Sequence, residues 1–184
     1  MARPTADVSV RVAWAADAEE IARLQVRAWR QAYDGVLPAR ALESLDVAAF
    51  AAQWQQAITR PTEARHRVLV ALDRVTVTGF VFTAPADDPD AHPEADGQLA
   101  EFLVDPDRTR QGHGSRLLQA GADTLRADRF VRATVWLAST DDVLRGFLTD
   151  AGWATDGAHR ELDLTGDGST TVKQLRLHTD LRQD

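Results

Sequence analysis

The sequence predicts an α/β protein of the α+β kind, with a mixed sheet that contains one parallel pair of strands. Residues 98–104, 115–129 and 131–137 have the patterns of a strand, a long helix and a second strand, and such a unit returns the second strand parallel to the first. Two further pairs of strand patterns predict antiparallel hairpins: 67–72 with 75–83, and 160–164 with 170–177.

The remaining elements follow from local patterns. Residues 8–14 alternate with period two, which predicts a half-buried strand with Val12 and Trp14 on its buried face. Asp17 is followed three positions later by Glu20, which is the spacing of a capping box. We therefore expect a helix that begins after Asp17 and ends at Gly35. Further helices are expected over residues 38–45, 48–58 and 141–150.

Length and composition indicate one domain over residues 1–184. The chain is 44% hydrophobic and 27% charged, which is ordinary for a globular protein. No window approaches 18 uncharged apolar residues, so we expect no membrane span, and residues 1–7 lack the apolar core of a signal peptide. These features predict a cytoplasmic protein.

Charge and residue content exclude several classes of function. The chain has no cysteine, which excludes disulfides, a thiol nucleophile and thiolate metal ligands. Its histidines show no spacing typical of a metal site, so no metal is expected. A formal net charge of -7 argues against nucleic acid as a partner, because nucleic-acid binding needs a basic surface.

Residues 103–118 join a strand to a helix through a basic turn that contains glycines. Gly112 and Gly114 let a ligand approach the backbone because they carry no Cβ atom, and the free N–H groups at the start of the next helix attract anions. The same segment holds guanidinium groups that match phosphate oxygens: Arg108, Arg110 and Arg116. The segment predicts a site for a small phosphorylated ligand, although a simple strand-to-helix turn with surface arginines is the plainer interpretation.

The spacing excludes two common phosphate-binding loops. A Walker A loop requires Gly-Lys followed by Ser or Thr, but His113 follows Gly112. A dinucleotide fingerprint requires Gly or Ala three residues after Gly114, where Leu117 stands.

The segment resembles the central motif of the GNAT N-acetyltransferase superfamily: a strand ending near V-x-P, then [QR]-x-x-G-x-[GA], then an apolar helix. Thr109 replaces the usual Gln or Arg, and the matching residues are Val104, Pro106, Gly112, Gly114, Leu117 and Leu118. The order of elements also resembles the GNAT fold. That fold implies a mostly antiparallel sheet of six to seven strands with one parallel, splayed pair, flanked by four to five helices.

The resemblance implies an N-acetyltransferase that moves an acetyl group from acetyl-CoA, bound as a co-substrate, to a primary amine by direct attack in a ternary complex. A catalytically degenerate sensor that binds acyl-CoA is the alternative. The acceptor is a small molecule or a peptide, and a homodimer is left open because many family members dimerise.

The resemblance also implies which residues bind acetyl-CoA. In the family the turn holds the pyrophosphate on backbone amides. The side chain of His113, which lies between the two glycines, is expected to point outward. Residues 141–150 resemble the last conserved helix of the family, with Asp141 in place of Asn. The implied set is Leu103, Val104, Thr109, Arg110, Gln111, Gly112, His113, Gly114, Ser115, Arg116, Asp141 and Phe147.

Acetyl transfer needs a hydrogen-bond donor that stabilises the oxyanion, and it needs an attacking amine that is neutral. The backbone N–H of Leu103, or of Val104, at the end of the splayed strand can stabilise the oxyanion. Glu101 is the candidate base, because it is the only carboxylate on this strand. The family often places its base at the position of Gln98, and residues 98 and 101 face opposite sides unless a bulge intervenes. Leu148 stands where many members have a proton-donating tyrosine, which should slow turnover without abolishing it.

Two segments are candidates for the acceptor site. Residues 26–38 resemble the first-helix region that forms one wall of the acceptor groove in GNAT enzymes, and Trp29 and Tyr33 share one stripe of this helix. These rings either pack in the core or face the acceptor. Residues 87–97 carry five carboxylates and form either a solvated, mobile connection or an acidic rim that attracts cationic amines.

Overall fold

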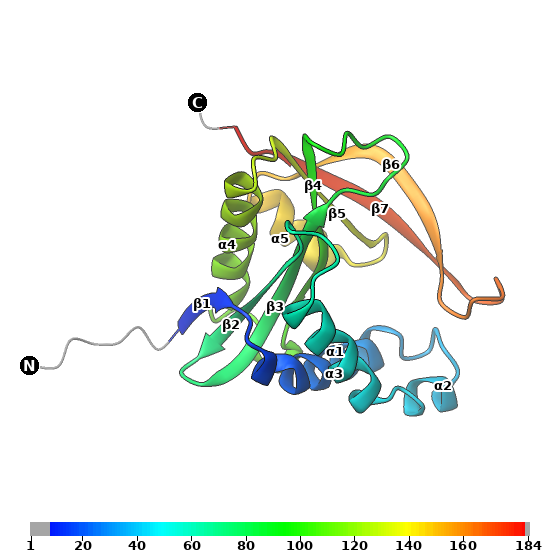
Figure 1. The fold of residues 1–184 in the computed structure, drawn as a ribbon. Helices are drawn as coiled ribbons and strands as arrows, with labels where there is room; N and C mark the ends of the chain where they lie inside the picture. The colour runs from blue at the N-terminus through cyan, green and yellow to red at the C-terminus, as the bar shows by residue number, and fades with distance from the viewer. Residues whose placement is uncertain (1–7, 183–184) are drawn as a thin grey trace, which may run out of the picture. The chain divides into compact units, whose positions relative to one another are not determined.

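The structure is a computed structural model that describes residues 8–182 (Figure 1). Within these residues a seven-stranded sheet has the hydrogen-bonded order β1-β2-β3-β4-β5-β7-β6. The strands are β1 (Val8–Val12), β2 (Arg67–Asp73), β3 (Thr76–Pro85), β4 (Asp96–Val104), β5 (Arg132–Ala138), β6 (Ala154–Asp163) and β7 (Thr171–Asp180). The helices are α1 (Ala18–Ala32), α2 (Ala39–Glu43), α3 (Val47–Thr59), α4 (His113–Ala127) and α5 (Asp142–Asp150), with 3₁₀ turns η1 (Ala15–Asp17) and η2 (Pro106–Arg108).

The strand pairing confirms the predicted mixed sheet. Strands β4 and β5 pair in parallel, from Asp96 opposite Arg132 to Leu99 opposite Val135. The pairs β1–β2, β2–β3, β5–β7 and β6–β7 are antiparallel. The helix between the parallel strands is α4, as the strand–helix–strand pattern predicted.

The chain groups into two compact units. Residues up to Thr83 together with Glu101–Thr124 form the first unit. Ala84–Ala100 together with the residues from Leu125 onward form the second unit. That residues 1–184 behave as a single domain stays a prediction.

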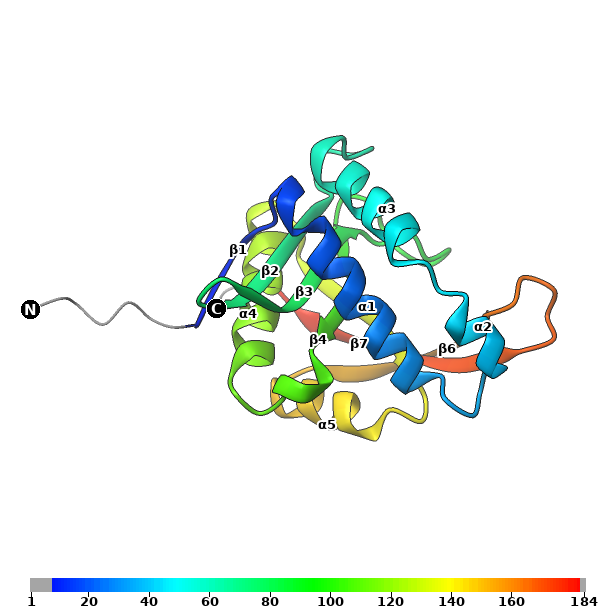
Figure 2. The same ribbon diagram turned by 90° about the horizontal axis from the view of Figure 1, so that it is seen from below.

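The core of the first unit lies between β2, β3 and the helices α1 and α3. Figure 2 shows these two helices lying side by side. Ile21 and Phe80 are fully buried in this cluster, where burying one large apolar side chain contributes roughly 1.5 to 3 kcal/mol. Trp54 packs edge-to-face on Phe80 with ring centroids 5.0 Å apart, and its indole N–H donates to Gln25 Oε1 over 2.7 Å. The buried indole therefore keeps a hydrogen-bond partner.

The opposite face of β3 approaches α4 and the end of β4. A Cβ atom at Gly79 would lie 2.8 Å from the carbonyl oxygen of Leu103 and 3.4 Å from a side-chain carbon of Leu117. Only glycine therefore allows β3 to pass so close to this part of the chain.

Two local predictions near the N-terminus were wrong in detail. Strand β1 ends at Val12, and the residues Val12 and Trp14 are 55% and 63% exposed. The guanidinium of Arg11 lies 3.8 Å from the Trp14 ring centroid and donates to Asp17 Oδ2 over 2.7 Å. Asp17 also accepts from the backbone N–H of Trp14, so its carboxylate stabilises η1 and makes no capping bond to α1.

Candidate active site

The turn between β4 and α4 presents free backbone N–H groups at the start of a long helix. Arg110 and Gly112 have φ of 62° and 83°, a conformation that side chains rarely adopt. The N–H of Arg116 donates to the carbonyl of Gly112 over 3.3 Å, so the N–H groups of residues 113–115 precede the first bond within α4. The first turn of α4 can therefore hold an anion.

The predicted arginines of this turn have different roles. Arg108 makes an ion pair of 2.9 Å with Asp73 on β2, so its charge stabilises the turn. Arg110 and Arg116 are exposed, and Arg116 Nη1 lies 3.4 Å from the carbonyl oxygen of Gly112. Among the other predicted residues of the turn, Gly114 is half-buried and the exposed ones are Thr109, Gln111 and Ser115.

The side chain of His113 does not point outward, and this prediction was wrong. Helix α4 begins at His113, whereas the sequence predicted a start at Ser115. His113 therefore lies one helical turn before Leu117, on the buried face of the helix, and is only 1% exposed. Its Nδ1 atom has no hydrogen-bond partner, and burial lowers the pKa of the imidazole. The spacing of four residues to Leu117 was the sequence signal for this orientation.

Glu101 lies on the face of β4 that is turned toward α1. Leu103 packs against the hydrophobic cluster of α1, α3, β2 and β3, and Glu101, two positions earlier, shares this face. The pairing of β4 with β5 runs to Leu99, so Glu101 lies beyond it. Glu101 keeps some accessible surface, but burial of its carboxyl group raises the pKa to about 7. Burial and the charge of Glu101 both raise the pKa of Tyr33, which indicates that the two side chains are near each other.

Gln98, the position that the family resemblance assigns to a base, has a different environment. Its Nε2 group donates to the carbonyl oxygen of Pro85 and to Asp87 Oδ1, each over 3.0 Å. The amide is thus engaged within the second unit, and it has no proton-accepting group of suitable pKa.

The backbone at the end of β4 has a defined orientation. The carbonyl of Leu103 faces Gly79 of β3, and the N–H of Asp105 donates to the carbonyl of Thr78 over 2.8 Å. Because N–H groups alternate in direction along a strand, the N–H of Val104 points away from β3. This geometry favours Val104 over Leu103 as the N–H donor to a ligand.

Aromatic residues at the C-terminal end of α1 form a contiguous group with Phe50. The Trp29 ring lies edge-to-face with Tyr33 and with Phe50 of α3, at centroid distances of 6.2 and 5.3 Å. Trp29 and Tyr33 are both half-buried. Their rings therefore pack against the helices and also retain surface that an acceptor could contact.

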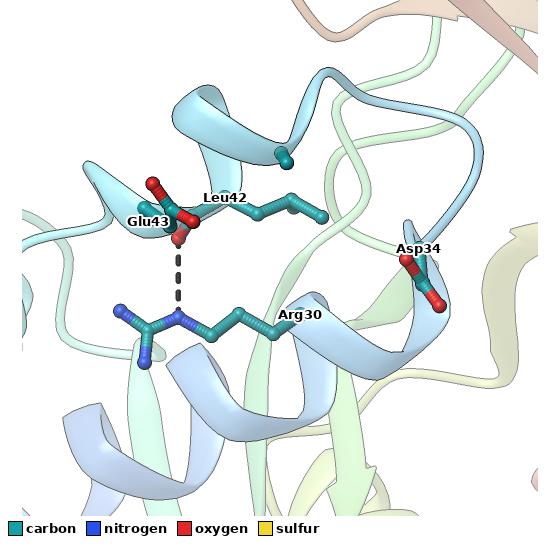
Figure 3. A pocket seen from close by; sticks show the side chains of 5 residues that line it. Arg30, Asp34, Leu42 and Glu43 are labelled. Atoms are coloured by element: carbon teal, nitrogen blue, oxygen red, sulfur yellow. Dashed lines mark hydrogen bonds between the residues drawn. The ribbon is translucent and has the colours of Figure 1, made fainter.

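A shallow cavity of about 400 Å³ adjoins the C-terminal end of α1 (Figure 3). The Nε group of Arg30 donates to the carbonyl oxygen of Leu42 on α2 over 3.1 Å, which holds the two helices together at this point. Both signs of charge are present among the lining residues, which are Arg30, Asp34, Ala39, Leu42 and Glu43.

The predicted residues of α5 belong to the second unit. Asp141 Oδ1 accepts a hydrogen bond of 2.9 Å from the N–H of Leu144, so its side chain caps the helix. Phe147 is half-buried. Leu148 is fully buried, which is consistent with the apolar residue found there in place of a tyrosine.

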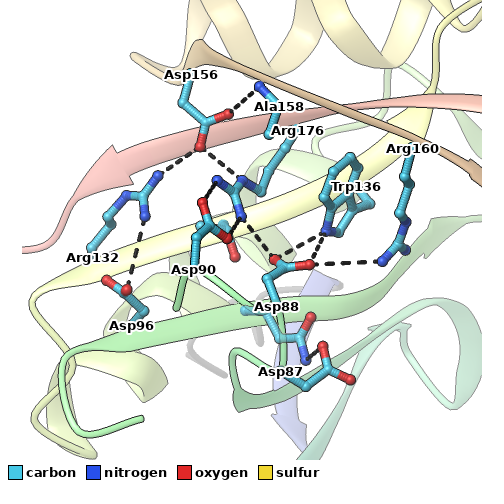
Figure 4. Close-up of polar contacts among 12 residues, drawn as sticks. Asp87, Asp88, Asp90, Asp96, Arg132, Trp136, Asp156, Ala158, Arg160 and Arg176 are labelled. Carbon is cyan, nitrogen blue, oxygen red and sulfur yellow. Dashed lines mark hydrogen bonds and ion pairs between the residues drawn. The ribbon is translucent and has the colours of Figure 1, made fainter. Parts of the chain in front are cut away.

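The acidic segment 87–97 is neither a solvated connection nor an open acidic rim, because several of its carboxylates form ion pairs within the protein. Arg176 of β7 is only 4% exposed and contacts three carboxylates, with Nη2 to Asp90 Oδ2 at 2.6 Å, Nη1 to Asp88 Oδ2 at 3.1 Å and Nε to Asp156 Oδ2 at 2.7 Å (Figure 4). Hydrogen bonding from Arg176 lowers the pKa of Asp90 to about 2.

Further contacts complete this ion-pair network, which comprises Asp88, Asp90, Asp96, Arg132, Asp156, Arg160 and Arg176. Arg132 contacts Asp96 and Asp156 at 3.8 and 2.6 Å. The indole N–H of Trp136 donates to Asp88 over 3.0 Å, and the guanidinium of Arg160 lies 4.2 Å from the Trp136 ring centroid. The carboxylates of the segment are therefore largely neutralised by arginines that lie far away in the sequence.

Two general features of the described residues bear on function. Within residues 8–182 no group of three or more Asp, Glu or His side chains could hold a metal ion. The helices of the same residues are all too short or too polar to cross a membrane.

Comparisons with known proteins agree with this architecture. Residues 20–153 match the model of the acetyltransferase (GNAT) family. The uncharacterized N-acetyltransferase YuaI of Bacillus subtilis (strain 168) is 31% identical over 131 residues, which cover 71% of each protein.

Solved structures with bound coenzyme share the fold. The yncA protein of Salmonella typhimurium, solved with its cofactor acetyl-CoA, aligns with a TM-score of 0.69 and 14% identity over 97% of this chain and 96% of that one. The PaiA N-acetyltransferase of Thermoplasma acidophilum, in complex with coenzyme A, aligns with a TM-score of 0.69 and 16% identity. The alignment covers 91% of this chain and 97% of that one.

Proposed function

The chain belongs to the GNAT acetyltransferase family and is an acyltransferase, and we propose that it moves the acetyl group of acetyl-CoA to a primary amine by direct attack in a ternary complex. The observation that carries this proposal is the turn before α4, where backbone N–H groups at the helix start make no bond within the helix and two arginines of the same segment are exposed. A small-molecule or peptide acceptor, a cytoplasmic location and a homodimer stay predictions.

The turn fits the pyrophosphate of acetyl-CoA. The N–H groups of residues 113–115 precede the first hydrogen bond within α4, and they carry the positive end of the helix dipole. Arg110 and Arg116 are exposed in the same segment and would add positive charge there. Thr109 and Gln111, which are exposed in the same turn, would make secondary contacts.

Val104 is the best-supported donor to the oxygen of the reacting thioester. Its N–H points away from β3, and it lies beyond the part of β4 that pairs with β5. A fixed backbone N–H costs no reorganisation when charge develops on the oxygen. Leu103, the donor that the sequence suggested first, has its carbonyl directed at β3.

Glu101 is suited to accept the proton of the attacking amine. A base works best when its pKa is near the working pH, and burial has raised the pKa of this carboxyl to about 7. The new C–N bond forms as the C–S bond breaks, the proton passes to Glu101, and the electron pair leaves with sulfur. A thiol with a pKa near 8.5 can leave without a protein acid, which accords with Leu148 being buried.

The acceptor is proposed to contact Trp29 and Tyr33. Both rings are half-buried, and the charge of Glu101 contributes to the raised pKa of Tyr33. An ammonium group can bind beside aromatic faces before it transfers its proton. The sensor alternative is not favoured, because a sensor has no need of a carboxyl with a pKa of about 7 at this position.

The test is release of free thiol from acetyl-CoA over a panel of primary amines, with calorimetric titration of acetyl-CoA in parallel. We expect binding, and thiol release that depends on an amine. Binding without release above the control that lacks an amine would favour the sensor, and no binding would contradict both functions.

A further inference from the structure

Asp105 fixes the point at which β4 leaves the sheet. Its side chain is 9% exposed and accepts a hydrogen bond of 3.0 Å from the N–H of Asp107 in η2. Its own N–H donates to Thr78 of β3 over 2.8 Å. Asp105 therefore sets the direction in which the chain enters the turn before α4.

The charge of Asp105 is balanced from α1. Arg27 Nη2 lies 2.6 Å from Asp105 Oδ2, and the two residues are far apart in the sequence. Because this carboxylate is nearly buried, the loss of its partner would leave a charge without compensation. An ion pair on the same helix offers a contrast, since Arg23 and Glu19 are 60% and 63% exposed and connect only neighbouring turns of α1.

The helix that holds Arg27 also holds the proposed acceptor wall. Trp29 follows Arg27 by two residues, and Tyr33 follows at the C-terminal end of the same helix. The other end of η2 is held by the ion pair between Arg108 and Asp73. The start of the turn is thus tied to the acceptor helix, and its later part is tied to β2.

We propose that Arg27 and Asp105 form a pair of positioning residues that couples the acceptor helix α1 to the turn that binds acetyl-CoA. This inference rests on the proposed function. Neither residue touches the reacting atoms. The pair holds the chain in place where it enters the turn, so its loss weakens acetyl-CoA binding more than it slows the chemical step.

The test compares Arg27→Met and Asp105→Asn with the double variant. Met keeps the aliphatic length of Arg, and Asn keeps an oxygen that can accept from Asp107. We expect each single change to raise the Kd of acetyl-CoA about tenfold, the scale of one hydrogen bond to a charged group. The double variant should bind as each single variant does, because both changes remove the same interaction. At saturating acetyl-CoA, kcat should fall less than about threefold while KM for acetyl-CoA follows Kd.

Arg23→Met is the matched control, with the same substitution one turn earlier on α1, and it should leave the Kd unchanged. Arg27→Lys should restore part of the affinity, because a lysine can reach the same carboxylate. Thermal unfolding of each variant shows that it is folded at the titration temperature.

The outcomes separate this inference from the proposed function. If the wild-type protein does not bind acetyl-CoA, the proposed function fails and the inference fails with it. If the wild type binds and Arg27→Met lowers only thermal stability, or if the effects of the two single changes multiply in the double variant, the inference alone is overturned.

Discussion

Two charged segments of the molecule use their charges in opposite ways. In the second unit, Asp88, Asp90 and Asp96 of residues 87–97 form ion pairs with arginines of the same unit. These arginines are Arg132, Arg160 and Arg176. In the first unit, the turn before α4 has N–H groups without helical acceptors and exposed guanidinium groups at Arg110 and Arg116. Charge that is matched inside the protein stabilises the fold, whereas polar groups left open at a glycine turn are available to a ligand.

The comparison predicts that the network contributes stability and the turn contributes binding. Arg176→Met should have the largest effect, because it removes a buried cation that contacts Asp90 and the nearly buried Asp88 and Asp156. We expect the free energy of unfolding to fall by about 3 to 5 kcal/mol, as measured by urea denaturation. Arg182→Met is the control, since the pair of Arg182 with Asp180 is exposed and should contribute less than about 1 kcal/mol. A loss no greater than that of the control would show that the network does not stabilise the fold.

Gly112→Val should reduce acetyl-CoA binding more than it reduces stability. The φ of 83° is strained for valine, so the turn should change shape and the affinity for acetyl-CoA should fall by about 100-fold or more. Gly35→Val is the matched control, because Gly35 has a φ of 74° and open space around it. Both variants should lose similar stability, but only the first should lose binding in a calorimetric titration. Equal affinities in the two variants would refute the anion site.

Glu101 should make both stability and activity depend on pH. The pKa of Glu101 is raised to about 7 from an ordinary 4.5, so the folded protein binds a proton that the unfolded chain releases between these values. This residue therefore makes stability fall as pH rises from about 4.5 to 7. Activity should change in the other direction, because only the ionised carboxylate accepts a proton, and kcat/KM should rise with pH through about 7.

Glu101→Gln separates these effects. It should lower kcat/KM about 100-fold at neutral pH, and the deficit should shrink at high pH, where the amine is deprotonated in solution. The Kd of acetyl-CoA should stay the same. Full activity in this variant would assign the proton to water. Asp105 is not a suitable substitute, since its carboxylate is bound to Arg27.

Tyr33→Phe should give the smallest effect. It keeps the ring beside Trp29 and removes only the hydroxyl group, whose pKa is raised by burial and by Glu101. We expect KM for the amine to rise about threefold, the scale of one neutral hydrogen bond, with little change in the Kd of acetyl-CoA. Trp29→Leu, which removes the ring, is the comparison. If both variants leave KM for every amine unchanged, the two rings serve only packing.

The sequence predicted the features that depend on local patterns. The parallel pair around α4, the hairpins and the glycine turn follow from periodicity and turn residues within short windows, and the structure has all of them. The predicted orientation of His113 was wrong because it depends on where α4 begins. The helix begins two residues earlier than predicted, and this places the side chain of His113 in the core.

The contacts between distant residues could not be predicted in this way. Nothing in the neighbourhood of Asp88 or Asp90 indicates that Arg176 is their partner, and the acidic segment therefore looked solvated. The same applies to Arg108, which looked like a phosphate ligand until its partner Asp73 was known. A pattern of residue types shows that charge is present, but only the fold shows whether that charge is already matched.

The close approach of β3 to the end of β4 has a consequence for how this site tolerates variation. Gly79 lies outside the motif of residues 103–118, yet any side chain there would press on the carbonyl of Leu103, which adjoins the N–H of Val104. In a library of random variants selected for turnover, position 79 should therefore be as depleted of substitutions as position 112. A redesign of the proposed acceptor contacts at Trp29 and Tyr33 would therefore have to keep this glycine.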